Sequence, residues 1–275
     1  MPELPEVETV RRGLTPAMQG RRIKALQVYR PNLRYPFPPK LSADLKGRRI
    51  DQIERVSKYL LFHFDKGPVL LGHMGMSGRF EITTKAAPLA PHSHLVFEME
   101  GETEIRYVDP RRFGIMVYAD RDAPMAHKLL SSIGPDPLSN AFNADVLNAA
   151  LKGRKTPIKS ALLDQKTVAG LGNIYVAEAL HRAGISPKRS AHTVAGKRAE
   201  RLVPHIRDVL NEAIASGGSS LNDYRQADGE LGYFQHNFRV YDREGTPCPA
   251  SPCQGTIRRI VQSGRSTFYC PSCQR

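Results

Sequence analysis

The apolar residues near the start of the chain lie three or four positions apart: Leu4, Val7, Val10 and Leu14. This spacing places them on one face of a helix. Acidic residues occupy the first turn and Arg11 and Arg12 the last, which complements the helix dipole. The pattern breaks between Gly13 and Pro16, so we expect the helix to end there.

From residue 21 to about residue 118, short apolar runs alternate with turn residues. Residues 59–64 and 69–71 read as two strands that are joined by a tight turn, and residues 95–99 and 105–108 are arranged in the same way. These runs predict a mostly antiparallel β-sandwich or barrel, with the first helix packed on it.

Beyond a linker at Gly134-Pro135-Asp136-Pro137 the apolar period becomes helical. We predict a helix near residues 146–151 that Asn143 caps, and a second one that begins with Thr156 as the cap and Pro157 as the first helical residue. Two further helices are expected at these positions: residues 174–182 and residues 202–214. Pro204 should kink the last helix or delay its start.

Residues 217–237 are polar and contain several glycines, with Tyr224, Tyr233 and Phe234 among them. A loop of this length in a compact enzyme is either functional or disordered.

The composition narrows the class of partner. A chain of 275 residues is long enough for two domains, and its formal charge of +13 favours a polyanionic partner. Nucleic acid is the first choice, although a ribosomal or membrane-surface protein has a similar charge. The sequence has no segment typical of a signal peptide or a transmembrane helix. We therefore expect a soluble, intracellular protein.

The cysteines form the strongest local signal. Cys248, Cys253, Cys270 and Cys273 all lie in the last 28 residues. Two cysteine pairs of this spacing can bind one tetrahedral Zn²⁺, which has no free position and is therefore structural. Between the pairs, residues 256–261 and 266–269 read as a β-hairpin with a turn at residues 262–265. Arginines in and beside the hairpin make this tail basic enough to bind DNA.

The N-terminus allows two interpretations. Pro2 and Pro5 with their glutamates are typical of a well-started helix. A small second residue such as proline also permits removal of Met1, which would expose a secondary amine that can attack an electrophilic carbon. Glu3 lies beside that amine and can transfer a proton.

Two glycine-containing loops carry side chains that could enter a base stack. Residues 73–78 contain Met76, and residues 109–114 contain Arg111 and Phe113. Exposed at loop tips, such side chains suit insertion into DNA. In ordinary hairpin turns, Met76 and Phe113 would instead be buried.

Three other features are weaker signals. Lys58 precedes an apolar strand and reads locally as a solvated lysine. His92 with His94 could bind phosphate, bind metal or cap a strand; without a nearby carboxylate or cysteine, metal is the least favoured. Gly170-Leu171-Gly172-Asn173 joins two helical segments, where exposed amides can bind a phosphate.

These motifs together resemble the bacterial formamidopyrimidine-DNA glycosylases, which repair oxidised purines. The resemblance runs from end to end and rests on five motifs in order: residues 1–9, residues 73–78, residues 109–114, residues 172–175 and the four-cysteine tail. It implies an α+β fold of several domains: an N-terminal antiparallel β-sandwich with a leading helix (1–133), a helix-two-turn-helix domain with a lesion-recognition loop (138–235) and a zinc finger (239–275).

The resemblance also implies the chemistry. It implies a bifunctional enzyme that excises 8-oxoguanine and formamidopyrimidines from double-stranded DNA through a Schiff base on Pro2, followed by β,δ-elimination. Glu3 would transfer protons, Lys58 would serve β-elimination and Arg265 δ-elimination. Further positions match residues that contact DNA or fill the gap left by the flipped nucleotide: His92, Arg111, Lys155, Asn173, Met76 and Phe113.

The resemblance finally implies one structural Zn²⁺, a monomer and a cytoplasmic, nucleoid-associated bacterial protein without a membrane partner. One departure is visible: four residues separate Cys248 and Cys253, where the family usually has two. Two alternatives remain open. One is the sister type of glycosylase that acts on oxidised pyrimidines (endonuclease VIII-like), which Leu4 and the Arg111–Phe113 loop disfavour. The other is a non-catalytic zinc-ribbon protein that only binds nucleic acid.

Overall fold

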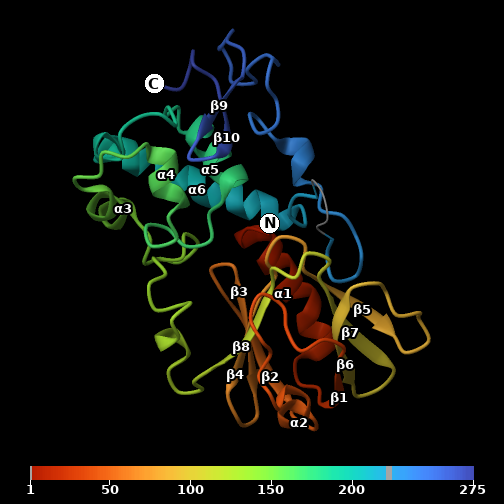
Figure 1. Ribbon diagram of the computed structural model, residues 1–275. Helices are drawn as coiled ribbons and strands as arrows, with labels where there is room; N and C mark the ends of the chain where they lie inside the picture. Colours follow the sequence, from red (N-terminus) through yellow and green to blue (C-terminus); the bar gives the residue numbers. More distant parts are fainter. Residues whose placement is uncertain (1, 221–224) are drawn as a thin grey trace. The chain divides into compact units, whose positions relative to one another are not determined.

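The computed structural model describes residues 2–220 and 225–275 (Figure 1). The chain forms two compact units. Unit 1 contains Met1–Ser131 and Ser216–Tyr233, and unit 2 contains Ser132–Ala215 and Phe234–Arg275. Within the described residues, no helix has both the length and the apolar character that crossing a bilayer requires.

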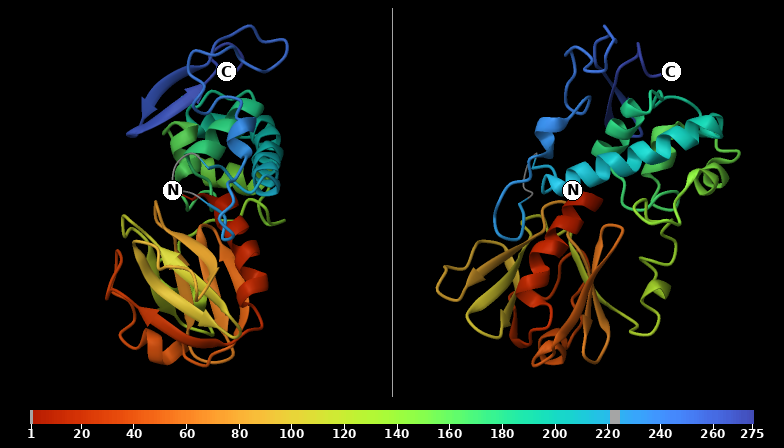
Figure 2. Two further views of the ribbon diagram at one scale, coloured as in Figure 1. Left: turned by 90° about the vertical axis from the view of Figure 1, so that its right-hand side faces the viewer. Right: turned by 180° about the vertical axis from the view of Figure 1, so that it is seen from behind.

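Unit 1 is a sandwich of two antiparallel sheets with a leading helix (Figure 2). The sheets have the strand orders β1-β6-β7-β5 and β2-β3-β4-β8. The elements of this unit are α1 (Leu4–Met18), β1 (Ile23–Val28), α2 (Leu41–Leu45), β2 (Ile50–Val56), β3 (Tyr59–Phe64), β4 (Val69–His73), β5 (Arg79–Thr84), β6 (Ser93–Met99), β7 (Thr103–Val108), β8 (Ile115–Ala119) and the short η1 (Pro124–Ala126).

Helix α1 buries its apolar face in the core of the sandwich. Val7, Val10 and Leu14 pack in one cluster with side chains from both sheets, which confirms the predicted packing of this helix. The helix continues through Pro16 to Met18, so the predicted end between Gly13 and Pro16 is wrong. Proline has no N–H, so the carbonyl group four residues earlier loses its helical donor. Because Pro16 lies on the exposed side of the helix, that carbonyl group can bind water instead.

Unit 2 combines helices with a C-terminal hairpin (Figure 1). Its elements are α3 (Ala144–Leu151), α4 (Ile158–Leu163), α5 (Asn173–Arg182), η2 (Ala191–Val194), α6 (Lys197–Ala215), η3 (Phe234–Asn237), β9 (Arg258–Gln262) and β10 (Arg265–Tyr269). The side chain of Asn143 accepts a hydrogen bond from the amide of Val146, as the predicted cap requires. The α+β class and the architecture of the fold are confirmed.

Three local predictions in unit 2 need correction. Pro157 is the N-cap of α4 and not its first residue. Helix α6 neither starts late at Pro204 nor breaks there, because Pro204 is exposed and lies on the solvated face of a strongly amphipathic helix. The hairpin turn consists of Ser263 and Gly264 alone, both with positive φ, so Arg265 is already the first residue of β10.

The segment after α6 packs with unit 1. The sequence instead predicts it as part of the helix-two-turn-helix domain, residues 138–235. The amide of Ile82 donates to the carbonyl oxygen of Ala227 at 2.8 Å, and the amide of Ser219 donates to Glu6 Oε1 at 2.9 Å. Ala227 is buried in the core of unit 1. Met1 and Tyr224 lie outside the described residues.

Candidate active site and metal centre

The start of α1 is held by a reciprocal capping box. Glu3 is the N-cap residue: its side chain accepts from the backbone of Glu6, and its own amide donates to Glu6 Oε2 at 2.8 Å. Both carboxyl groups are buried, and Pro2 is buried beside them. Because these bonds fix the backbone of Glu3, they also fix where Pro2 lies in unit 1.

Lys58 occupies the tight turn between β2 and β3. Its residue is only 6 % exposed, so the local reading of a solvated lysine is wrong. The preceding Ser57 has a φ of 57°, a left-handed conformation that a serine adopts only when its surroundings hold it. Arg55 provides part of that support: Nη1 donates to the carbonyl oxygen of Ser57 at 3.2 Å, and Nε lies 3.2 Å from Glu8 Oε2 on α1.

A buried carboxylate joins the two glycine-containing loops of unit 1. Asp109 Oδ1 accepts from the hydroxyl of Ser77 at 2.7 Å, and Oδ2 accepts from the amide of Gly114 at 2.8 Å. The amide of Arg111 in turn donates to the Ser77 hydroxyl at 3.2 Å. The loop at residues 73–78 and the loop at residues 109–114 therefore form one hydrogen-bonded platform.

The glycine of the first loop permits its close approach to the second. Gly75 has a φ of +67°, and a Cβ atom there would lie 2.4 Å from the carbonyl carbon of Phe113. On the platform, Met76 is 42 % and Phe113 43 % exposed, so these side chains do not fill the core as they would in ordinary turns. The guanidinium carbon of Arg111 lies 4.8 Å from the centre of the Phe113 ring.

Two histidines of unit 1, His73 and His94, support these loops. His73 Nδ1 accepts from the amide of Gly75 at 3.0 Å, and burial together with the nearby Lys58 and Arg34 lowers the pKa of His73 to about 4. His73 is therefore neutral at physiological pH, as an acceptor must be. His94 Nε2 lies 2.8 Å from the carbonyl oxygen of Asp109, whereas His92 is exposed with a φ of 66°.

In unit 2, two helices hold strand β10 of the hairpin close to its turn. The carbonyl oxygen of Ser266 accepts from Lys159 Nζ at 2.8 Å and from Asn173 Nδ2 at 3.0 Å. Lys159 also donates to the hydroxyl of Thr267 at 2.6 Å and is almost fully buried, so it contributes no surface charge. Arg265 precedes Ser266 and is exposed, as is Lys155.

A second buried acid holds the chain that leads into the tail. Glu178 on α5 is fully buried, and its carboxylate accepts from three consecutive amides, those of Arg239, Val240 and Tyr241, at 3.0, 3.0 and 2.9 Å. Three amide donors satisfy most of the hydrogen-bonding capacity of a buried carboxylate.

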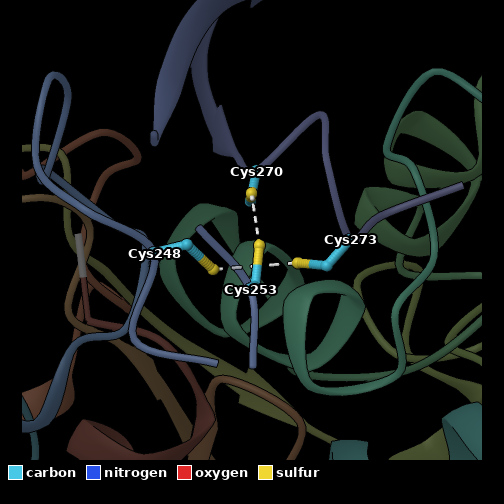
Figure 3. Close-up of side chains that lie close together, drawn as sticks. All are labelled: Cys248, Cys253, Cys270 and Cys273. Atoms are coloured by element: carbon cyan, nitrogen blue, oxygen red, sulfur yellow. Dashed lines mark hydrogen bonds between the residues drawn. The ribbon is translucent and has the colours of Figure 1, made fainter. Parts of the chain in front are cut away.

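The four cysteines converge as predicted (Figure 3). Their Sγ atoms lie within 4.8 Å of one another, and two cross-pair distances, Cys248–Cys273 and Cys253–Cys270, are both 3.7 Å. A tetrahedral ion with Zn–S bonds of 2.3 Å requires sulfur atoms about 3.8 Å apart, whereas a disulfide requires about 2 Å. The cluster therefore fits one structural Zn²⁺.

The sequence did not single out three buried charged residues that shape these sites. Asp109 enters the sequence motifs only as part of the loop at residues 109–114, and Glu178 and Lys159 belong to none of them. A charged residue on the apolar face of a helix is the signal that could have identified Glu178 and Lys159.

Comparisons with known proteins agree with this architecture. Three family models match in order: the formamidopyrimidine-DNA glycosylase N-terminal domain (residues 1–116), the H2TH domain of the same enzymes (residues 133–225) and the zinc finger found in FPG and IleRS (residues 245–275). The formamidopyrimidine-DNA glycosylase of Azorhizobium caulinodans is 55 % identical over 293 residues, with all of both chains covered.

Solved structures give the same result. The MutM (FPG) protein of Thermus thermophilus is 42 % identical with a TM-score of 0.87, over 99 % of this chain and 98 % of that one. A mutant Lactococcus lactis FPG in complex with Fapy-dG-containing DNA is 34 % identical with a TM-score of 0.91 and full coverage of both chains. Matches of this extent concern the whole molecule, its zinc finger included. This chain belongs to the formamidopyrimidine-DNA glycosylase family, a family of DNA glycosylases that act on damaged DNA.

Proposed function

We propose that this chain is a bifunctional enzyme that removes oxidised purines from double-stranded DNA and then cuts the strand at the abasic site. The substrates are 8-oxoguanine and formamidopyrimidines, a choice that the Fapy-dG complex of the L. lactis relative supports. The observation that carries the proposal is the reciprocal bonding of Glu3 and Glu6, which holds Pro2 at the buried start of α1.

The first step uses the secondary amine that removal of Met1 exposes on Pro2. The amine nitrogen bonds to C1′ of the damaged nucleotide while the bond from C1′ to the base breaks, and the departing base receives a proton. Glu3, the neighbouring carboxyl group, transfers protons in this step and in the opening of the sugar ring. The nitrogen then carries the positive charge of an iminium ion.

The second stage breaks the strand on both sides of the lesion. The iminium acidifies C2′; loss of a C2′ proton expels the 3′ phosphate oxygen, and a further elimination expels the 5′ one. We assign the first elimination to Lys58, which lies buried in the strained turn between β2 and β3. We assign the second to Arg265, which the two-residue turn presents at the exposed end of β10.

DNA binding requires that the damaged nucleotide leave the stack, because C1′ is shielded inside the duplex. The exposed side chains on the loop platform, Met76, Arg111 and Phe113, would fill the resulting gap, with Arg111 toward the opposite cytosine. His92 and Lys155 are exposed, and Asn173 lies at the start of α5. We propose that all three contact the phosphate backbone of the DNA. The protein would act as a monomer. Its functional parts would be residues 1–133, 138–235 and 239–275, of which residues 216–233 pack with unit 1.

Borohydride trapping tests the nucleophile. Native protein with a duplex that contains 8-oxoguanine opposite cytosine should yield a covalent adduct whose peptide map places DNA on Pro2. A variant with one extra residue before Pro2 should give no adduct while its zinc content stays unchanged. Pro2→Gly, which leaves a primary amine, should trap more slowly. Equal trapping by the extended variant would contradict the proline mechanism. If the native protein gives no adduct, the alternative of a protein that only binds nucleic acid would be favoured.

Substrate choice needs a separate measurement. Single-turnover excision of 8-oxoguanine opposite cytosine should be faster than excision of thymine glycol by the same preparation. Equal rates, or a preference for the pyrimidine, would replace the purine assignment by the sister type.

A further inference from the structure

The long spacing of the first cysteine pair changes the donors around its sulfur atoms. A zinc site with four thiolates carries two net negative charges, which nearby N–H groups stabilise by hydrogen bonds to sulfur. In the second pair, Cys270 and Cys273, the Cys270 sulfur accepts from two backbone amides, those of Ser272 and Cys273.

The first pair is built differently. The Cys248 sulfur accepts from the amide of Ala250, two residues on, as in the second pair. The next part of the loop forms a turn of its own, in which the Cys253 amide donates to the carbonyl oxygen of Ala250 at 2.6 Å. Pro249 and Pro252 have no N–H to offer. The longer loop therefore supplies fewer amide donors for Cys248.

A side chain from α5 lies where a further donor would be needed. His181 is 3 % exposed, and its Nε2 lies 3.3 Å from Cys248 Sγ. Its Nδ1 is buried without a hydrogen-bond partner among the residues that the structure describes. A proton on Nδ1 would be buried without an acceptor and would leave the Nε2 lone pair facing a thiolate. The proton therefore belongs on Nε2, from which the ring donates to sulfur.

We propose that His181 is a positioning residue of the zinc centre, which donates a hydrogen bond from Nε2 to the Cys248 thiolate and slows loss of the metal. The bond offsets part of the negative charge on the sulfur and fixes the Cys248 side chain in its ligand position. It also joins α5 to the finger one turn beyond Glu178, which holds the chain at Arg239–Tyr241. This role depends only on the zinc centre and is independent of the Pro2 chemistry.

Zinc release from the full-length, zinc-loaded protein tests the role without reference to DNA cleavage. Release is followed with a chromophoric chelator in excess. His181→Phe keeps a ring of similar size but has no donor, and it should release zinc on the order of tenfold faster than the native protein. His181→Gln restores a side-chain N–H and should stay within about threefold of the native rate. His205→Phe, at a partly exposed histidine on α6, is the matched control and should leave the rate unchanged.

Equal release rates for the native protein and His181→Phe would overturn the proposal, and so would a Gln variant as fast as the Phe variant. If His181→Phe does not fold, the native protein still decides the point. Nitrogen-15 NMR of the His181 ring should show a protonated Nε2 and an unprotonated Nδ1. A proton on Nδ1 alone would refute the donor role.

Discussion

Glu6 on α1 and Glu178 on α5 are both buried, and the carboxylate of each accepts hydrogen bonds from backbone amides far away in the chain. They differ in which other amides they bind. Glu178 accepts hydrogen bonds from three consecutive amides of one bent segment, residues 239–241. Glu6 divides its oxygens between its own helix start, at the amide of Glu3, and the distant amide of Ser219. Glu178 thus binds one segment through three amides in a row, whereas Glu6 fixes the start of α1 and also binds the returning segment at Ser219.

The difference teaches how rigidity is distributed. The chain at Arg239–Tyr241 leads into the zinc finger and cannot shift without breaking several charge-assisted bonds together. At Ser219 the bond to Glu6 uses one amide, and the cap at Glu3 does not depend on it. We expect the two segments to differ accordingly in local stability.

The largest effect should come from Glu178→Gln. The new amide group presents N–H toward backbone donors, so at least one bond is lost and a buried polar group is left unpaired, at about 3 kcal/mol. The hydrogen-exchange rates of the backbone amides at residues 239–241 should rise about a hundredfold. Glu200→Gln, exposed on α6, is the control. Unchanged exchange would contradict the fastening role.

Low pH should weaken the contribution of another buried acid, Glu8, to the stability of unit 1. Burial raises the pKa of Glu8, but hydrogen bonds from Arg11 and Arg12 outweigh it and lower the pKa to about 2. Because the folded pKa lies below the ordinary value of 4.5, Glu8 stabilises unit 1 above that pH. This contribution, at most about 3 kcal/mol, is lost as the pH falls from about 4.5 through 2.

Urea unfolding of the native protein and Glu8→Gln across this pH range measures the contribution. The variant should be less stable near pH 6, and the two stabilities should approach each other as the pH falls. A constant difference between them would show that Glu8 is not the titrating group.

Asp109→Asn should separate the two loops of the platform. One of the bonds to Ser77 or Gly114 is lost, which costs about 2 kcal/mol. Because the carboxylate belongs to both loops, exchange should rise at residues 73–78 and 109–114 together. Asp122→Asn, on an exposed connection, should change neither loop. An increase confined to one loop would contradict the shared platform.

The smallest effect is expected for Glu6→Gln. The amide oxygen can still accept one bond, so the loss is about 1 kcal/mol. Exchange of the Ser219 amide should rise, by less than Glu178→Gln changes residues 239–241. Glu102→Gln, in an exposed turn, is the control. A larger effect of Glu6→Gln than of Glu178→Gln would reverse the comparison.

Local signals explain what could be predicted from the sequence. The apolar period of α1, the Asn143 cap and the cysteine spacing each concern residues that are close in the chain, and the structure confirms them. The apolar helix faces of Lys159 and Glu178 indicate burial, but their partners could not be predicted, because these lie 61 to 108 residues away in the chain. The prediction for Pro204 was wrong although it used a local rule. Proline removes one helical hydrogen bond, but on an exposed helix face the unpaired carbonyl group can bind water, and the helix continues.

The roles of Pro2, Glu3, Lys58 and Arg265 stay predictions. Sequence motifs suggested them, and the structure contributes their surroundings: a capped, buried start of α1, a buried lysine on a strained turn and an exposed arginine at a hairpin tip. Their reactivity depends on DNA, which a pattern of residues does not contain.

The return of residues 216–233 to unit 1 has a consequence for biosynthesis. Ala227 belongs to the core of that unit, and its carbonyl oxygen continues the hydrogen bonds of β5 at Ile82. A ribosome therefore delivers the last piece of the first unit only after all the helices from α3 to α6 have been made. The two units cannot be produced as consecutive halves of the chain, and the nascent first unit must wait, incomplete, while its neighbour emerges.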